Sequence, residues 1–350
     1  MKVIAWPAFK TKYKNPYNWL LYNHLSQQGA EVTEFSFKTI LQQNYNIFHL
    51  HWPVETIVRH PNLLVAGTRA RLMLALIDWV RYRGTRIVWT IHDQKPHLLL
   101  HPKLASWFES EFIKRVDGAI NLCQSSQALT NESFPRLQHC PNTIIPHGHY
   151  REVYPNNISK TQARESLNIP ENHRSLMFLG YIDRYKNVPQ LIHIFRELQP
   201  PNWTLVIAGK PEISKLAEEV IQTAANAQNL KLDLKFIPDQ QVQIYLKAAD
   251  LVVLPFEQIL NSGSAILALS FDCPVLLPKQ GALAELQTQV GVDWVKLYEG
   301  EFTTTVLQNG LNWVIETVRS QQAPLDALDW LKLSQQTLNF YEEVITHSTR

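Results

Sequence analysis

Short apolar runs alternate with longer amphipathic segments along the whole chain. The runs are rich in Val, Ile and Leu, which is typical of strands that are buried on both faces of a parallel sheet. The segments between them carry apolar residues every three or four positions, as helices that pack one face on a sheet do. Strands that alternate with helices at this spacing predict an α/β fold with doubly wound parallel sheets.

The pattern divides into two such arrays, which predicts two domains. In the first half, strands are expected at 2–6, 31–37, 46–52, 86–91, 118–122 and 143–146, and helices at about 18–28, 70–82 and 104–116. A polar connection at 156–161 has the composition of a linker. Beyond it, strands are expected at 176–180, 203–208, 232–237 and 251–254 and from 274, with helices at 162–167, 189–198, 212–226, 242–248 and 265–271.

The stretch between Asp250 and Glu285 predicts a strand, a loop of small residues, a helix and a second strand. Its loop reads Asn261, Ser262, Gly263 and Ser264, and the helix after it is almost wholly apolar. Such a loop places backbone N–H groups and a helix N-terminus at the carboxyl end of a parallel strand, an arrangement that binds phosphates. The Gly-Lys-Ser/Thr signature of a P-loop is absent, so an ordinary β-α-β unit with a polar loop remains an alternative.

Three cations directly follow predicted strands of the second half, namely Arg184, Lys186 and Lys210. Each of them alone is typical of a solvated surface charge. Cations at the carboxyl ends of strands, close to a helix N-terminus, suit a diphosphate. Together with the small-residue loop they favour a binding site for a nucleoside diphosphate.

Polar side chains also gather where the predicted strands of the first half end. Ligands of open α/β sheets bind at this edge. Any one of these residues alone is more often a structural loop residue, but several together indicate a site. The candidates are His51, Glu55, His92, Asp93, His97, Ser125, Ser126 and His147.

Composition narrows the class of protein. The 350 residues are 45% hydrophobic and 18% charged, as in a globular protein. The formal net charge of +2 does not create the strong positive potential that is typical of nucleic-acid-binding proteins. Cys123, Cys140 and Cys273 are scattered, which favours a reducing compartment and offers no metal-ligand spacing. With no signal peptide and no run long enough to span a bilayer, we expect a cytoplasmic protein, either soluble or peripheral to the membrane.

Basic and aromatic residues mix in two places, the loop at 10–17 and the helix at 70–82. One interpretation is contact with an anionic membrane surface or with a lipid-phosphate acceptor. The alternative is a solvated face with ordinary packing aromatics, because the basic residues are few. Near the end of the chain a helix is expected at about 328–344, and its apolar face needs a partner surface.

Several segments of the second half resemble GT-B glycosyltransferases, in particular the large retaining group that uses nucleotide sugars. The segments occur in the order of that family: 145–148, 163–170, 179–180 with Lys186 and Asn187, 206–209, 249–255, and 274–275 with Gly281 and Glu285. The first half is similar more loosely, through 49–53 and 90–93, to a bacterial exopolysaccharide subgroup. The resemblance implies Rossmann-like domains at 1–155 and 156–325 facing across a cleft, with 326–350 packing back on the first.

The resemblance also implies an activity, the transfer of a sugar from a nucleotide diphosphate sugar to a glycan or lipid-linked glycan. Members of the group typically need no bound divalent cation and no cofactor, and the chain has no Asp-x-Asp pair. The family's glutamate pair falls on Ile259 and Leu267, with Glu257 nearby, and its arginine falls on Tyr181, with Arg184 as a possible substitute. The implied donor-binding residues are Gly180, Arg184, Lys186, Lys210, Asn261, Ser262, Gly263, Ser264 and Glu285.

For the chemistry, Asp93 is the expected base if the reaction inverts the anomeric centre, with Glu55 and His92 as further candidates. If the reaction retains configuration, His92 is expected to hold the sugar, while His51 and His147 line the cleft. An alternative role for Asp93 is to cap the next turn. Two other functions stay open: a nucleotide-sugar epimerase on the same fold, and a partner subunit without catalytic activity.

Overall fold

The computed structural model describes residues 1–13, 15–92 and 100–347, and it divides into two compact units. Unit 1 comprises Met1–Gly148 and Leu328–Arg350, and unit 2 comprises His149–Ala327. From the sequence, the first boundary was predicted a few residues later, at 155/156, and the second slightly earlier, at 325/326. The first boundary falls earlier because Tyr150 donates its N–H to Ser270 at 2.9 Å and Arg151 pairs with Asp272 at 2.6 Å, both within unit 2.

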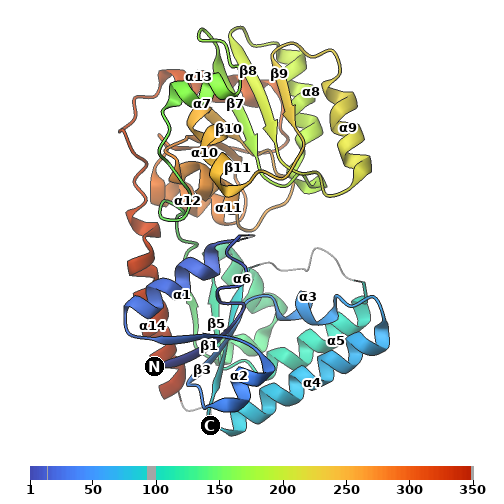
Figure 1. Cartoon of the computed structure of the whole chain (residues 1–350), viewed down its shortest axis with the longest axis vertical. Helices are drawn as coiled ribbons and strands as arrows, with labels where there is room; N and C mark the ends of the chain where they lie inside the picture. Colours follow the sequence, from blue (N-terminus) through green and yellow to red (C-terminus); the bar gives the residue numbers. More distant parts are fainter. Residues whose placement is uncertain (14, 93–99, 348–350) are drawn as a thin grey trace. The chain divides into compact units, whose positions relative to one another are not determined.

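Unit 1 is built on a parallel six-stranded sheet in the order β2-β1-β3-β4-β5-β6 (Figure 1). Its strands are β1 (Lys2–Trp6), β2 (Glu31–Glu34), β3 (Ile47–Leu50), β4 (Arg86–Ile91), β5 (Gly118–Asn121) and β6 (Asn142–Ile144). Its helices are α1 (Tyr17–Gln27), α2 (Phe37–Gln42), α3 (Pro53–Val58), α4 (Leu63–Tyr82), α5 (Pro102–Ile113), α6 (Gln124–Ser133), the 3₁₀ helix η1 (Pro135–His139) and α14 (Trp330–Thr346).

Unit 2 carries a second parallel six-stranded sheet in the order β12-β11-β10-β7-β8-β9. Its strands are β7 (Arg174–Leu179), β8 (Trp203–Ala208), β9 (Leu230–Asp233), β10 (Leu251–Val253), β11 (Val275–Pro278) and β12 (Val295–Tyr298). Its helices are α7 (Lys160–Ser166), η2 (Arg184–Lys186), α8 (Val188–Leu198), α9 (Ser214–Ala224), α10 (Asp239–Ala248), α11 (Gly263–Ser270), α12 (Ala282–Val290) and α13 (Thr304–Glu316); η3 (Asp326–Leu328) leads back to unit 1.

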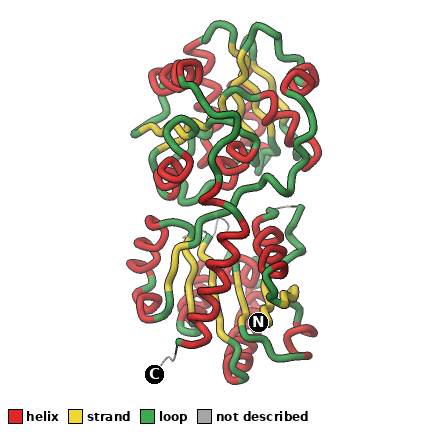
Figure 2. The backbone as a smooth tube through the Cα atoms, turned by 90° about the vertical axis from the view of Figure 1, so that its left-hand side faces the viewer, coloured by secondary structure: helices red, strands yellow, loops and turns green. Residues whose placement is uncertain are grey.

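In both units the strands lie between layers of helix (Figure 2). The two faces of the unit 1 sheet differ in chemistry, because successive residues of a strand point to opposite faces. Phe48 of β3 belongs to the apolar core that also contains Phe108 and Phe112 of α5. His49, the next residue, contacts Tyr22 of α1 and Tyr341 of α14 instead. The α1–α14 side of this sheet therefore contains buried polar groups, whereas the α4–α5 side is apolar.

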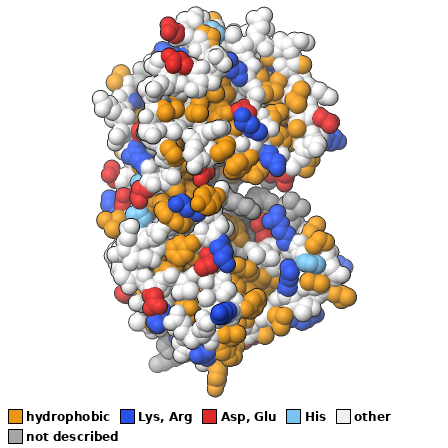
Figure 3. All heavy atoms as spheres, viewed as in Figure 1, with side chains coloured by type: hydrophobic (Ala, Val, Ile, Leu, Met, Phe, Trp, Pro, Cys, Tyr) orange, Lys and Arg blue, Asp and Glu red, His pale blue; other side chains and the backbone are white. Residues whose placement is uncertain are grey.

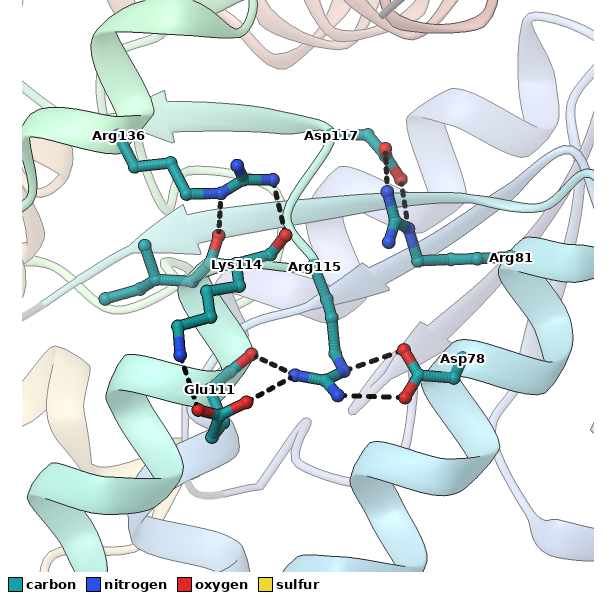
Figure 4. A network of polar contacts seen from close by, with 8 residues as sticks. Asp78, Arg81, Glu111, Lys114, Arg115, Asp117 and Arg136 are labelled. Carbon is teal, nitrogen blue, oxygen red and sulfur yellow. Dashed lines mark hydrogen bonds and ion pairs between the residues drawn. The ribbon is translucent and has the colours of Figure 1, made fainter.

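Ion pairs fix α4 and α5 to each other and to the sheet (Figure 4). The Arg115 guanidinium, just after α5, binds both Asp78 of α4 and Glu111 of α5, at 2.7 and 3.0 Å. The Asp117 carboxylate accepts from Arg81 of α4 at 2.9 Å and from the backbone N–H of Ile87 in β4 at 2.8 Å. These acidic groups are thus neutralised within unit 1, and their contacts tie α4 to α5 and to the sheet.

The structure corrects several of the expected strands. The strand expected at 232–237 is β9 (Leu230–Asp233). The strand expected at 31–37 ends at Glu34, because Ser36 caps α2 and exchanges hydrogen bonds with Thr39 in a capping box. The strand expected at 46–52 ends at Leu50, because Pro53 stands at the first position of α3. His51 and Trp52 consequently lie in the turn between strand and helix.

The C-terminal helix α14 belongs to unit 1 and packs along α1, with further contacts to β4. Trp330, Phe340 and Tyr341 of this helix are buried. Gln28, at the end of α1, donates a hydrogen bond to Ser334 of α14 at 2.6 Å. The end of the chain thus supplies side chains to the interior of unit 1.

Candidate functional site

In unit 2, the loop and helix that follow β10 form a first candidate site. β10 is a central strand between β7 and β11, and its three residues are buried. The hydroxyl of Ser262 caps α11 by accepting from the N–H of Ala265 at 3.1 Å. The N–H groups of Gly263 and Ser264 belong to the first turn of the helix, where they have no helical acceptor. They are therefore suited to an anion.

A buried lysine lies beside this helix start. Gly180 directly follows β7 and has a φ of +142°. A Cβ atom at this position would lie 3.2 Å from Ser264 Oγ and 3.5 Å from Lys186 Nζ. The Ser264 hydroxyl and the Lys186 ammonium therefore both lie close to the position that a side chain at residue 180 would occupy. Lys186 is only 8% exposed, and burial lowers its pKa to about 8 although Asp183 acts in the opposite direction. Within the described residues, the ammonium has no ion pair or hydrogen bond; its partner is the Tyr185 ring, whose centroid lies 5.8 Å away.

An ammonium without an anionic partner is costly to bury, since a charge that leaves water needs compensation and a distant aromatic ring supplies little of it. Lys186 nevertheless remains close to the helix N-terminus, where it meets a second source of positive potential. Both features disfavour a cation and favour an anionic ligand with several oxygens. A diphosphate meets these requirements.

The loop between β10 and α11 is held in place by backbone contacts. Gly281 has φ of +50°, and a Cβ atom there would approach the carbonyl oxygens of Ile259 and Leu260 to 2.7 and 2.6 Å. The N–H of Ala282 donates to the carbonyl of Leu260 at 2.8 Å. Glycine is thus required by both the positive φ and the close approach. The helix start is positioned before any ligand binds.

The other predicted donor-binding residues are arranged differently. Arg184, the expected substitute for the family's arginine, is largely exposed and pairs with Glu219 of α9 at 3.4 Å. Lys210 is exposed at the end of β8, and Asn261 is half-buried in the loop. Glu285 lies in the first turn of α12. Of this set, the structure brings together Gly180, Lys186 and Ser264, with Ser262 capping the same helix.

A second group of polar side chains lies in unit 1. His51 and His92, which follow neighbouring strands, come together with His51 Nδ1 at 2.9 Å from His92 Nε2. The His92 ring stacks on Trp52 at 4.2 Å between centroids. The Tyr17 ring contacts His51, His92 and His147 at 6.0, 5.0 and 4.7 Å. The edge of the unit 1 sheet therefore gathers three of the predicted histidines around one tyrosine.

Burial keeps the imidazoles of His51 and His147 neutral. It lowers the pKa of His147 to about 4, although a hydrogen bond to the carbonyl of Gly148 at 2.8 Å acts in the opposite direction. It also lowers the pKa of His51 well below its usual value, with His49 and His92 adding to the effect. Neutral imidazoles offer one donor and one acceptor each, as hydroxyl groups of a sugar require.

Of the remaining predicted residues in unit 1, Glu55 takes another position. Glu55 lies in the first turn of α3, close in sequence to this cluster. Asp93 and His97 lie outside the described residues. Among the described residues, no cluster of three or more His, Cys, Asp or Glu side chains is arranged to hold a metal ion.

Sequence reasoning missed four members of the unit 1 cluster, namely Tyr17, Tyr22, His49 and Tyr341. His49 was detectable, because it precedes His51 by two positions and the two side chains share a face of the strand. Tyr341 was assigned only to an apolar helix face. Its hydroxyl lies 2.6 Å from His49 Nδ1, a contact between residues 292 positions apart.

Known proteins agree with this architecture. The family described as "Glycosyl transferases group 1" matches residues 159–288. A GDP-mannose:glycolipid 4-beta-D-mannosyltransferase of Xanthomonas campestris is 31% identical over 95% of this chain and 89% of its own length. A lipopolysaccharide 1,2-N-acetylglucosaminetransferase of Salmonella typhimurium is 26% identical over 59% of this chain and 55% of its own.

Solved structures show the same fold. Sucrose-phosphate synthase of Thermosynechococcus elongatus superposes with a TM-score of 0.66 at 15% identity, covering 99% of both chains. HepE of Anabaena, in complex with UDP-glucose, gives 0.63 at 16% identity and covers 98% of both. The predicted two-domain GT-B fold is confirmed. From the extent of the Xanthomonas match together with the family match, the chain belongs to the group 1 glycosyl transferases and is a glycosyltransferase.

Proposed function

We propose that this glycosyltransferase moves a sugar from a nucleotide diphosphate sugar to a glycan or lipid-linked glycan during synthesis of a cell-surface polysaccharide such as an exopolysaccharide. The observation that carries the proposal is the buried ammonium of Lys186 beside the first turn of α11. Negative charge builds on the leaving diphosphate in the transition state, so a fixed cation and oriented N–H groups lower the barrier. We expect this charge to make a bound metal ion unnecessary.

The relatives indicate which donors to test. The Xanthomonas relative is named for GDP-mannose and a glycolipid, and HepE was solved with UDP-glucose. Thermal unfolding with each nucleotide sugar identifies the donor, since a ligand at 100 times its Kd stabilises by about 2.7 kcal/mol. Turnover with an acceptor supports transfer. Release of free sugar without an acceptor supports an epimerase, and binding without turnover supports a partner subunit.

The unit 1 cluster is the proposed contact for the reacting sugar. His92 lies within hydrogen-bonding distance of His51 and stacks on Trp52, so its ring is fixed for a hydroxyl ligand. His51 and His147 line the same edge of the sheet. If the reaction inverts the anomeric centre, Asp93 and Glu55 are the carboxylates that remain candidates for the base, because a carboxylate accepts a proton without burying a new positive charge.

Donor binding is expected to weaken above about pH 8. The pKa of Lys186 in the protein without ligand is about 8, below its usual value of 10.5, so its ammonium loses its proton as the pH rises through this range. The Kd of the nucleoside diphosphate should therefore rise by up to about tenfold per pH unit above pH 8. Calorimetric titration between pH 7 and pH 10 measures this dependence.

Lys186→Arg is the matched control for the pH titration, since an arginine stays charged throughout. Its affinity should vary little with pH even if it is weaker at pH 7. In the wild type without ligand, the free energy of unfolding should increase over the same pH range in which the affinity for the diphosphate falls. Because the pKa is lowered on folding, this group destabilises the protein below pH 8, and that cost disappears as the pH rises toward 10.5. A wild-type Kd that stays constant to pH 10 contradicts the role of Lys186.

We further propose that unit 1 binds the cytoplasmic face of an anionic membrane through the outer face of α4. Leu64, Leu72, Trp79 and Tyr82 are 79, 59, 37 and 91% exposed. At 100° per residue these four positions fall within one third of the helix circumference. Figure 3 shows hydrophobic and basic side chains intermingled over the part of unit 1 where α4 and α5 lie in Figure 1.

Charge on this face matches an anionic surface. The guanidinium of Arg83 lies over the Trp79 ring at 4.5 Å, and that of Arg71 over Trp107 at 5.4 Å. Asp78, the acidic residue on the same side, is neutralised by Arg115. Apolar and aromatic residues with arginines beside them are typical of helices that lie in the membrane interface. Within the described residues, no helix is long and apolar enough to cross a bilayer.

The double substitution Leu64→Asp and Leu72→Asp is expected to abolish binding to vesicles that contain phosphatidylglycerol. Each exposed leucine that enters the interface contributes up to about 1.5 kcal/mol, and each aspartate adds repulsion. Co-sedimentation with the vesicles measures binding, and turnover of a soluble acceptor should be unaffected. Val318→Asp, at a residue of unit 2 that is 91% exposed, is the control. Equal sedimentation of the double variant and the wild type contradicts the assignment.

A further inference from the structure

A cavity of about 430 Å³ lies within unit 2, at the carboxyl ends of β10, β11 and β12. Cavities that bind small molecules are typically about 300 to 1,000 Å³ in volume, so this one is large enough for a ligand. Aromatic rings and side-chain amides line it, namely Phe256, Tyr298, Phe302, Asn187, Gln190 and Gln280. Such a mixture of apolar surface and hydrogen-bonding groups is typical of a binding site.

The cavity is separate from the groups proposed to bind the diphosphate. The N–H of Glu257, in the loop after β10, donates to the carbonyl oxygen of Tyr185 in η2 at 2.8 Å. The centroids of the Tyr185 and Phe256 rings are 5.9 Å apart. These contacts join the loop to η2. Lys186 of the same 3₁₀ helix lies beside the start of α11, and none of the proposed donor-binding residues lines the cavity.

Tyr298 contributes a buried hydroxyl to the lining. The residue is 8% exposed, its ring packs on that of Phe302 at 5.6 Å between centroids, and burial raises the pKa of its phenol above the usual range. Among the described residues, this hydroxyl has no hydrogen-bond partner. A polar group that leaves bulk water without a partner costs free energy. Because Tyr298 lines the cavity, a ligand there can supply the missing hydrogen bond.

The charge of the lining disfavours an anionic ligand. Glu257 and Glu301 line the cavity, whereas no lysine or arginine of the described residues does so. Lys279 pairs with Glu299 at 2.7 Å instead. Two carboxylates without a cation repel phosphates and acidic sugars. Within the same described residues, no cluster of three or more His, Cys, Asp or Glu side chains is arranged to hold a metal ion. The lining therefore favours a neutral molecule with many hydrogen-bonding groups.

A neutral sugar meets these requirements. Its ring presents C–H groups that pack on an aromatic face, and its hydroxyl groups donate to carboxylates and accept from amides. We propose that this cavity binds a neutral sugar unit of the acceptor glycan, apart from the groups that react. The inference rests on the proposed function, in which the acceptor is a glycan. The cavity holds the glycan without taking part in the transfer step.

Saturation-transfer NMR with the methyl glycosides of glucose, mannose and galactose tests this assignment in the full-length protein. At least one glycoside should receive saturation from the wild type, and titration of the signal gives its Kd. In the double variant Tyr298→Phe and Glu301→Gln, this Kd should rise at least about tenfold, because the sugar loses a phenol and a carboxylate as partners. An equal Kd in the wild type and the variant, or no signal with any glycoside, overturns the proposal.

Tyr154→Phe together with Glu316→Gln is the matched control. It makes the same chemical changes at two residues of unit 2 that do not line the cavity, so the glycoside Kd should stay at its wild-type value. Tyr298→Phe should leave the Tm unchanged, because the hydroxyl that it removes has no partner to lose. Glu301→Gln alone, at an exposed residue, should still raise the glycoside Kd if the double variant fails to fold.

Calorimetric titration of UDP and of GDP distinguishes a glycan from the nucleoside of the donor. The double variant should bind both nucleotides with the wild-type Kd. A Kd roughly tenfold weaker indicates that the nucleoside occupies the cavity, which overturns the glycan assignment. A wild type that binds a glycoside in this cavity but transfers no sugar contradicts the proposed function alone. An active wild type with a glycoside Kd that the double substitution leaves unchanged contradicts the present inference alone.

Discussion

Lys186→Met is expected to lower kcat/KM for the nucleotide sugar by a hundredfold or more while making the protein without ligand more stable. Loss of a fixed charge beside a developing diphosphate costs about 2 to 4 kcal/mol in the barrier. Methionine keeps the apolar stem but removes the buried ammonium, whose lowered pKa reflects unfavourable desolvation. The free energy of unfolding at pH 7 should therefore rise by roughly 1 to 3 kcal/mol. Steady-state kinetics and urea unfolding measure the two effects.

Lys210→Met provides the comparison. Lys210 also follows a strand of unit 2, but it is exposed, so its removal should change stability within about 0.5 kcal/mol. Its effect on kcat/KM should be far smaller than that of Lys186→Met. A loss of activity in Lys186→Met together with a loss of stability indicates a structural lysine. Unchanged kinetics in this variant contradict the placement of the diphosphate.

The fold could be predicted from the sequence wherever the spacing of apolar residues agreed with the residues that begin and end helices and strands. In unit 2, the strand expected at 251–254 is β10 (Leu251–Val253), and the apolar helix expected after it is α11 (Gly263–Ser270). Predictions of this kind succeed because a strand buried on both faces and a helix with one apolar face leave different patterns. They failed at 35–37, where Ser36 begins a helix through a capping contact that a strand-like composition concealed.

The site was harder to predict, because burial and long-range contacts are not local properties. Arg184, Lys186 and Lys210 look alike in the sequence, each being a cation after a strand. In the structure, Lys186 is buried beside Ser264, Arg184 pairs with Glu219, and Lys210 is exposed. The sequence identifies the segment in which the cation lies, whereas the packing of neighbouring loops decides which cation is desolvated.

The departure from the family's glutamate pair has a physical counterpart in α11. The position that the family fills with its second glutamate is Leu267, a half-buried residue of an otherwise apolar helix. A leucine offers no acceptor for a ribose hydroxyl. We therefore expect recognition of the donor to depend more strongly on the diphosphate, which would make the Lys186–Ser264 region the sensitive part of the proposed site.

Gly180→Ala is expected to abolish nucleotide binding with a moderate loss of stability. The added methyl group would lie 3.2 Å from Ser264 Oγ and 3.5 Å from Lys186 Nζ, in the space between the two groups proposed to bind the diphosphate. With φ of +142°, alanine is also strained there, at a cost of about 1 to 3 kcal/mol. Calorimetric titration of a nucleoside diphosphate into the folded variant should give at least a hundredfold weaker Kd.

Gly84→Ala separates the two effects of the Gly180 substitution. Gly84 also has positive φ, +92°, but a Cβ atom there meets no other atom within 4 Å, and it lies after α4 in unit 1. This control should lose stability through backbone strain and keep the wild-type affinity for the nucleotide. If the folded Gly180→Ala variant binds as tightly as Gly84→Ala does, the diphosphate does not approach the end of β7. If its affinity alone is lost, a steric block between Lys186 and α11 is the cause, because backbone strain by itself leaves the binding groups in place.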